Sequence, residues 1–154
     1  MARLVKRAFK YRFYPTDGQA AELSRTFGCV RLVCNRALEE RTRAWYGERR
    51  RVSCVQSSAA LTEWKKAGEF AFLAEVSSVP LRQVLRHLRT ASGYFVAQRA
   101  MYPRFKSRKK SRVSAEYTRS AFTWREGRLT LAKMAGSLDI RWLRPSRRVR
   151  SRRR

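Results

Sequence analysis

The hydrophobic period of this sequence changes twice, and these changes limit the folds open to the chain. Aromatic residues alternate with other residues from Phe9 to Phe13, which is the period-two pattern of a half-buried strand. Between residues 16 and 101 apolar residues recur every three or four positions, as on the buried face of a helix. After residue 112 the period returns to two. The pattern predicts an α+β fold, with a helical bundle inserted into a small β-module.

Capping residues indicate where the helices begin. Thr16 with Gln19, and Ser53 with Gln56, each have the spacing of a capping box. Pro80 fits the first turn of a third helix, with the serine two residues before it as the cap. The expected helices cover about residues 17–46, 55–66 and 78–101.

The strands at the two ends of the sequence are expected to meet. After residue 121, alternating apolar residues lead into Glu126-Gly127, a two-residue turn candidate, and alternation returns from Leu138 to Trp142. The strand near the N-terminus has no neighbour until these later strands form, so it is expected to pair with them. The large aromatic residues are expected in the core: Phe9, Phe13, Phe27, Trp64, Phe95, Trp124 and Trp142.

The charge of the chain points to a polyanionic partner. The formal net charge is +26, and removing the seven arginines of the last eleven residues still leaves +19. Residues 104–112 read RFKSRKKSR, a basic run with an aromatic inside it. Lysine and arginine displace counterions from nucleic acid, and Tyr102 and Phe105 offer aromatic faces to an unstacked base. The run predicts RNA or DNA as the partner, and the alternative is a solvated loop.

Several other classes of protein are disfavoured. No stretch has the length of a membrane span, and no secretory signal follows the basic N-terminus. Cys29, Cys34 and Cys54 lack C-x-x-C spacing, and His87 is the single histidine, so we expect reduced thiols, no metal and no cofactor. The sequence has only two aspartates and no glycine-rich phosphate loop, so we expect no catalytic residues and no small-molecule substrate.

Four motifs, in this order, carry a resemblance to a known family. They are Ala8-Phe9-Lys10-Tyr11-Arg12-Phe13-Tyr14-Pro15-Thr16, then Phe27-Gly28-Cys29-Val30-Arg31 with Asn35-Arg36-Ala37-Leu38, then Ser78-Val79-Pro80-Leu81, then Tyr102-Pro103-Arg104-Phe105-Lys106-Ser107-Arg108-Lys109. Over about residues 3–143 the chain resembles the N-terminal part of the TnpB (OrfB) proteins of bacterial insertion sequences. These proteins are described as transposases and as RNA-guided DNA endonucleases related to type V CRISPR effectors.

The resemblance implies a division into parts. Residues 1–15 and 112–143 would form a small wedge-like β-barrel or meander, and residues 16–101 a helical recognition domain that begins with a helix-turn-helix region. Residues 102–111 would form a basic nucleic-acid-binding loop, and residues 144–154 an Arg-rich disordered tail. The RuvC-like nuclease and its zinc ribbon would lie beyond residue 154, so the chain is expected to be truncated before the catalytic domain and not to be an enzyme.

The resemblance also implies guide RNA and DNA as partners in the bacterial cytoplasm, in association with the nucleoid. Arg31 and Asn35, four residues apart on one helix, either form a polar recognition edge or are a surface pair. The expected nucleic-acid-binding residues are Lys10, Arg12, Arg31, Asn35, Tyr102, Arg104, Phe105, Lys106, Arg108, Lys109 and Lys110.

Two further hypotheses remain at this point. The first two helices could form a helix-turn-helix that binds a DNA sequence, although the loop between them, residues 47–53, is longer than such motifs use. The chain could also be an inactive relic, or an inhibitor that interferes with full-length TnpB by occupying its RNA.

Overall fold

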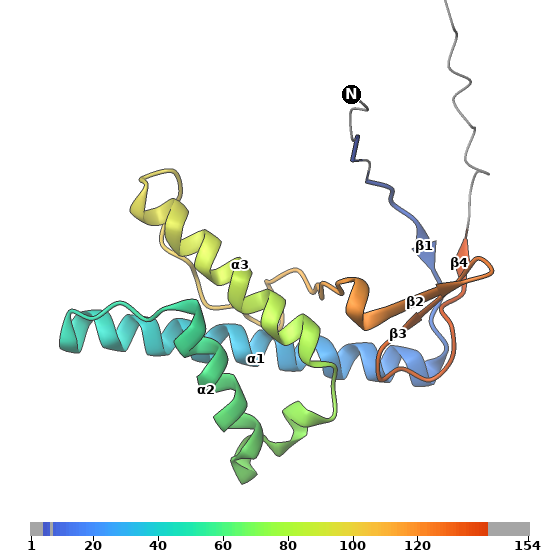
Figure 1. Ribbon diagram of the computed structural model, residues 1–154, viewed down its shortest axis with the longest axis horizontal. Coiled ribbons are helices and arrows are strands. Elements are labelled where there is room, and N and C mark those ends of the chain that lie inside the picture. Colours follow the sequence, from blue (N-terminus) through green and yellow to red (C-terminus); the bar gives the residue numbers. More distant parts are fainter. Residues whose placement is uncertain (1–4, 7, 142–154) are drawn as a thin grey trace, which may run out of the picture.

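The computed structural model describes residues 5, 6 and 8–141. The described residues form three α-helices, α1 (Asp17–Glu48), α2 (Cys54–Lys66) and α3 (Ser78–Val96). The 3-10 helix η1 (Gly68–Ala74) connects α2 to α3. Figure 1 shows α3 running across α1, and the strands gathered beside the N-terminal part of α1. A second 3-10 helix and four short strands complete the described part: η2 (Arg119–Ala121), β1 (Arg12–Phe13), β2 (Phe122–Arg125), β3 (Arg128–Leu131) and β4 (Ile140–Arg141).

Both predicted capping boxes are confirmed. The side chain of Thr16 accepts from the backbone N–H of Gln19, and the Gln19 side chain accepts from the backbone N–H of Thr16. The same reciprocal pair closes the start of α2 between Ser53 and Gln56. The third helix begins at residue 78 as predicted, but its cap is Ser77 and not Ser78, and it ends at Val96, short of residue 101.

The main core lies where α3 packs on α1. It takes buried residues from one stripe of each helix, with α2 and η1 closing its sides. Leu81 and Leu85 on α3 are fully buried, as are Val33 and Ala37 on α1. The stripes predicted from the period of 3.6 are therefore the surfaces that pack.

A second, smaller cluster ties the N-terminal half of α1 to the β-hairpin. Leu23 of α1 is buried with Leu131 and Leu138, and Phe27 packs at its edge. The buried side chain of Gln19 extends this contact, because its amide nitrogen donates to the carbonyl oxygens of residues 135 and 137 at 3.2 and 3.0 Å. One helix thus carries both clusters.

The predicted pairing of the first strand with the last is confirmed, and so is the hairpin turn. β1 pairs antiparallel with β4 in the register Arg12 to Arg141. β2 and β3 pair across Glu126 and Gly127, whose φ angles are +49° and +77°. Two successive positive φ angles match the twist of a two-residue hairpin, which explains the glycine at the second position.

The predicted wedge-like β-barrel is wrong for the described residues. The four strands form two separate two-stranded sheets, of orders β1-β4 and β2-β3, joined by one isolated bridge between Leu129 and Leu138. Strands of two to four residues present too few backbone groups to close a barrel. The alternation of residue types predicted strands in these regions but not their bounds. The first strand starts at Arg12 and the last at Ile140, later than the alternation indicated. Trp142 and the predicted tail of residues 144–154 lie outside the described residues.

The prediction that the large aromatic residues form the core is mostly wrong. Phe27 and Trp64 are half-buried against the two clusters. The other four described members of that set are exposed, with relative exposures from 38% to 70%: Phe9, Phe13, Phe95 and Trp124. Leucine, valine and small residues fill the bundle instead, because α1 and α3 pack through stripes of these side chains.

Stability should reside in the bundle. Leu85→Ala removes a fully buried side chain from the main core, and we expect it to lower the free energy of unfolding by about 2–5 kcal/mol in chemical denaturation. Leu131→Ala, in the smaller cluster, is the matched control and should cost less. An equal or larger loss for the control would show that the hairpin, and not the bundle, sets the stability of the chain.

Candidate nucleic-acid interface

Two polar residues of α1 hold the basic segment that follows α3. Asn35 and Thr42 lie seven residues apart on this helix, so they face the same side at a spacing of about 10 Å along its axis. Asn35 binds Lys106, and Thr42 binds Tyr102. The segment after α3 is thereby anchored to α1 at two points.

Asn35 makes the stronger of these two anchors. Its Nδ2 donates to the carbonyl oxygen of Lys106 at 2.9 Å, and its Oδ1 accepts from the Lys106 backbone N–H at 2.8 Å. A side-chain amide carries the same donor and acceptor as a peptide group, so it can satisfy both polar groups of one residue at once. The backbone at Lys106 is therefore fixed, while the Lys106 side chain remains half-exposed.

Residues 107–111 form a closed turn, which we call the basic turn. The Ser107 backbone N–H donates to Ser111 Oγ at 2.8 Å, and the Lys110 N–H donates to Ser107 Oγ at 2.9 Å. The Ser111 N–H also donates to the Ser107 carbonyl oxygen at 3.2 Å. Three hydrogen bonds thus fix the shape of the basic turn, and the side chains of Arg108, Lys109 and Lys110 are exposed at its tip.

Tyr102 provides the second anchor. Its hydroxyl lies 2.9 Å from Thr42 Oγ1, and its ring meets the Phe95 ring edge-on with centroids 5.1 Å apart. Phe105 lies between the two anchors and is 59% exposed. Tyr102 is therefore used mainly for packing, whereas the ring of Phe105 is available at the surface.

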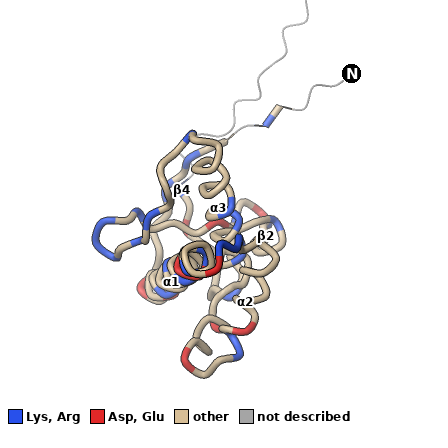
Figure 2. Tube along the Cα trace, turned by 90° about the vertical axis from the view of Figure 1, so that its left-hand side faces the viewer, with Lys and Arg blue, Asp and Glu red and all other residues tan. Residues whose placement is uncertain are grey.

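The cations of this segment have no acidic partners among the residues that the structure describes. Within the described residues the ion pairs lie elsewhere, for example between Arg25 and Glu75 and between Arg43 and Glu39. Figure 2 shows few acidic positions along the coloured part of the trace, against many basic ones. None of the following five residues takes part in an ion pair within that described part: Arg104, Lys106, Arg108, Lys109 and Lys110.

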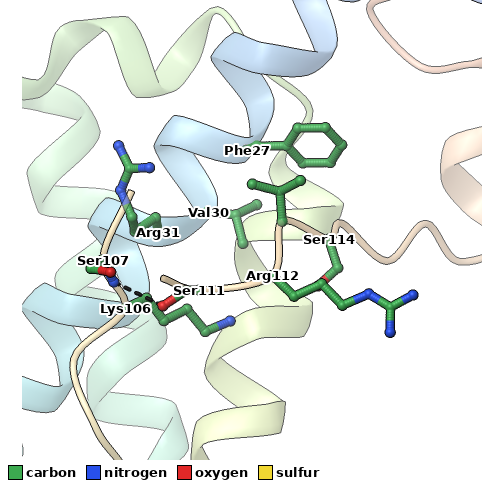
Figure 3. Close-up of a pocket in the computed structure, with 9 residues that line it drawn as sticks. Phe27, Val30, Arg31, Lys106, Ser107, Ser111, Arg112 and Ser114 are labelled. Atoms are coloured by element: carbon green, nitrogen blue, oxygen red, sulfur yellow. Dashed lines mark hydrogen bonds between the residues drawn. The ribbon is translucent and has the colours of Figure 1, made fainter. Parts of the chain in front are cut away.

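Arg31 lies beside the basic turn, across a narrow pocket (Figure 3). The pocket has a volume of about 20 Å³ and is lined by Phe27, Val30 and Arg31 of α1 and by residues 106, 107 and 111–114. This volume suits a single water molecule and no larger ligand. In Figure 3 the guanidinium groups of Arg31 and Arg112 extend in different directions, so the charge is spread over a surface rather than aimed at one point.

Lys10 and Arg12 lie away from this surface. Both are exposed, and Arg12 belongs to β1, which precedes the start of α1 at Asp17. Asn35 is eighteen residues further on, about 27 Å along the helix. The structure therefore brings Arg31, Asn35, Tyr102 and the residues of the basic turn together, and it does not bring the two strand residues to them.

Sequence analysis missed the residues that shape the loop. Thr42 was not singled out, and neither were Ser107 and Ser111 as a pair. The spacing of the two serines around the basic tip was an available signal, because serine side chains commonly close turns by bonding to nearby backbone groups. Arg112 was part of the predicted run but was not named as a site residue.

The remaining polar chemistry of the described chain gives no sign of a catalytic centre. Burial raises the pKa of the Cys29 and Cys34 thiols, so these cysteines favour their protonated, unreactive form. Within the described residues no three side chains of His, Cys, Asp or Glu gather as metal ligands would. No helix in that part of the chain is long and apolar enough to cross a membrane.

These features define a class: a helical protein that presents a fixed run of unpaired cations, as proteins that bind polyanions do. A family model described as "Helix-turn-helix domain", that of the OrfB insertion-sequence proteins, matches residues 1–50. A protein of Streptomyces pristinaespiralis named "Putative RNA-guided DNA endonuclease" is 79% identical over 145 residues, which are 94% of this chain and 36% of that protein. The resemblance to the N-terminal part of the TnpB (OrfB) family is thus confirmed.

A second relative is more distant. The Escherichia coli (strain K12) protein named "Putative RNA-guided DNA endonuclease InsQ" is 36% identical over 101 residues, which are 66% of this chain and 25% of that protein. The chain therefore spans about a third of the length of the first relative and a smaller share of the second.

The role of Asn35 can be tested without any ligand. Asn35→Ala removes both hydrogen bonds to Lys106, and we expect the Lys106 amide to exchange with solvent at least about ten-fold faster, since each bond contributes about 1 kcal/mol. Arg43→Ala, an exposed change on the same helix, is the control. Unchanged exchange at Lys106 in the Asn35 variant would mean that Asn35 does not fix the loop.

Proposed function

We propose that this chain binds nucleic acid through the phosphate backbone, with the basic turn as the principal contact. One observation carries the proposal: three exposed cations, without acidic partners in the described part of the chain, stand on a backbone that Asn35, Ser107 and Ser111 hold in one shape. A solvated loop with the same charge would not need these bonds. Because the turn is already ordered, binding costs little further conformational entropy.

The remaining expected contacts extend this surface. Arg104, Lys106 and Arg31 border the basic turn, and Phe105 offers an exposed ring on which a base can stack. Lys10 and Arg12 would contact the nucleic acid only if the bound nucleic-acid strand continues along α1 toward the N-terminal end of this helix. In this proposal Asn35 positions the turn and does not itself touch the ligand, because both of its polar atoms are occupied by Lys106.

The relatives suggest which nucleic acids are bound. Both carry "Putative RNA-guided DNA endonuclease" in their names, so guide RNA and DNA are the partners that we propose, with residues 16–101 and the loop of residues 102–111 as the binding part. Binding to the RNA of a full-length relative, with inhibition of that relative, would use the same contacts. The phosphates are common to all of these ligands.

The charge of the basic turn can be tested with a matched control. We expect the triple change Arg108→Gln, Lys109→Gln and Lys110→Gln to weaken binding to unrelated RNA and DNA sequences alike. The log–log salt dependence of the wild-type affinity should be steeper than about −4, and the triple variant should be shallower by about 2–3, since each phosphate contact contributes slightly less than one. Fluorescence anisotropy over a range of salt concentrations measures both quantities.

The control removes three charges that are already paired. Arg25→Gln, Arg43→Gln and Lys66→Gln change the net charge by the same amount, but each of these residues forms an ion pair with a glutamate. Affinity and salt slope should then stay close to those of the wild type. Equal losses in the two triple variants would show that only total charge matters, and that the basic turn is a solvated loop.

The second candidate function is recognition of a DNA sequence by a helix-turn-helix, which the description of the matching family model favours. The matched residues contain one continuous helix, α1, and α2 begins at Cys54 after a connection of residues 49–53. A helix-turn-helix usually has a turn of three or four residues. Competition separates the two candidates: phosphate binding is displaced by any duplex, whereas sequence recognition survives an excess of unrelated DNA.

We also propose that the chain as given performs no chemistry. A two-metal nuclease needs converging carboxylates, and the described residues offer none as a cluster. We expect no Mg²⁺-dependent cleavage of single- or double-stranded DNA when the chain is supplied with a guide RNA from a related element. Cleavage that is lost in Asp17→Ala or Asp139→Ala would overturn this part of the proposal.

A further inference from the structure

A pocket of about 220 Å³ lies between α1, α3 and the extended segment that follows the basic turn. Val30 and Val84 give it an apolar floor, and Gln83, His87, Lys106 and Glu116 supply its polar groups. It is about ten times larger than the pocket of Figure 3, and it shares Lys106 with that pocket. It therefore borders the proposed phosphate contact directly.

The polar group that is free to bind a ligand in this pocket is the amide of Gln83. It is not a sealed, unpaired group, because the enclosed side-chain atoms without a partner in the described residues are the Nε and Nη2 of Arg41. Only 8% of this residue is exposed, and no hydrogen bond joins its side chain to any other described residue. Since Gln83 lines the pocket, its amide is accessible from the pocket and can pair with a ligand there. Gln19, the other buried glutamine, is fully used: its amide nitrogen donates to two carbonyl oxygens, and its oxygen accepts from Thr16.

The rest of the pocket suits a flat ligand with polar edges. The apolar floor can contact the face of a ring, and His87 at the rim is held by Glu116, with its Nε2 2.5 Å from the Glu116 Oε2. The Gln83 amide offers one donor group and one acceptor, the combination that pairs with the edge of a nucleobase. Lys106 lies between the pocket and the basic turn, close to where a phosphate would follow such a base.

We propose that this pocket takes one unstacked nucleobase of a bound single strand, with the Gln83 side chain hydrogen-bonded to the edge of the base. The inference rests on the proposed function, since the phosphates of the same strand would lie on the basic turn. Proteins that recognise single strands commonly splay out a base in this way and bind its edge. The pocket then gives the chain a contact to bases that its phosphate contacts alone do not provide.

The test separates the base from the phosphate. The probes are a single-stranded DNA oligonucleotide, an RNA of the same sequence, and a fully abasic DNA of the same length, which keeps every phosphate. We expect wild type to bind the oligonucleotide with bases more tightly than the abasic one, and Gln83→Met to lose about ten-fold of that preference with its salt slope unchanged. Thr62→Val, an exposed polar-to-apolar change on α2, should behave as wild type.

A spectroscopic readout does not depend on the variant folding. In the wild type, the side-chain NH₂ signals of Gln83 should shift when the oligonucleotide with bases is added, and should not shift with the abasic one. If Gln83→Met keeps the preference for bases, or if the Gln83 signals respond to neither probe, the pocket does not bind a base. The proposal of phosphate binding would be unaffected by either result. Loss of all binding by the wild type would overturn the proposed function as well. The DNA and RNA arms show which strand supplies the base.

Discussion

One helix constrains the whole molecule. The 32 residues of α1 form both the main core with α3 and the smaller cluster with the hairpin, and they also carry Asn35 and Thr42. Because these contacts lie on one rigid rod, the hairpin, the bundle and the basic turn keep fixed positions along it. The short strands could not supply such a frame, since none exceeds four residues.

The function that we propose depends on the fixed backbone at Lys106 and in the basic turn. A chain of net charge +26 binds polyanions wherever its cations are free, and such binding alone has little selectivity. The hydrogen bonds from Asn35 to Lys106 and those within the basic turn hold three of these cations in one arrangement, and the pocket at Gln83 lies next to them. Because these groups are held in place, we expect a nucleic-acid strand to bind along one path on this surface, and not wherever the chain is positively charged.

Sequence patterns predicted the features that are local. The capping boxes at Thr16 and Ser53 involve residues three apart, so spacing alone identified them. Phe9 is exposed and not in a core, because its burial would require distant strands to stay paired over a greater length. No local pattern encodes that length, and the predicted barrel is wrong for the same reason. The sequence left two alternatives for Asn35, because its partner Lys106 lies 71 residues away. No sequence pattern predicted a role for Gln83, since only the assembled pocket shows that its amide borders a cavity without a partner among the described residues.

Lysine footprinting tests the central claim most directly. The free chain and its complex with a single-stranded oligonucleotide are treated with an acetylating reagent, and the modification of each lysine is compared by mass spectrometry. If the basic turn is the phosphate contact, Lys109 and Lys110 become protected in the complex, while Lys66, which is paired with Glu63 on α2, reacts as before. If Lys109 and Lys110 react equally in the free and bound chain, the nucleic acid lies elsewhere and the account is contradicted.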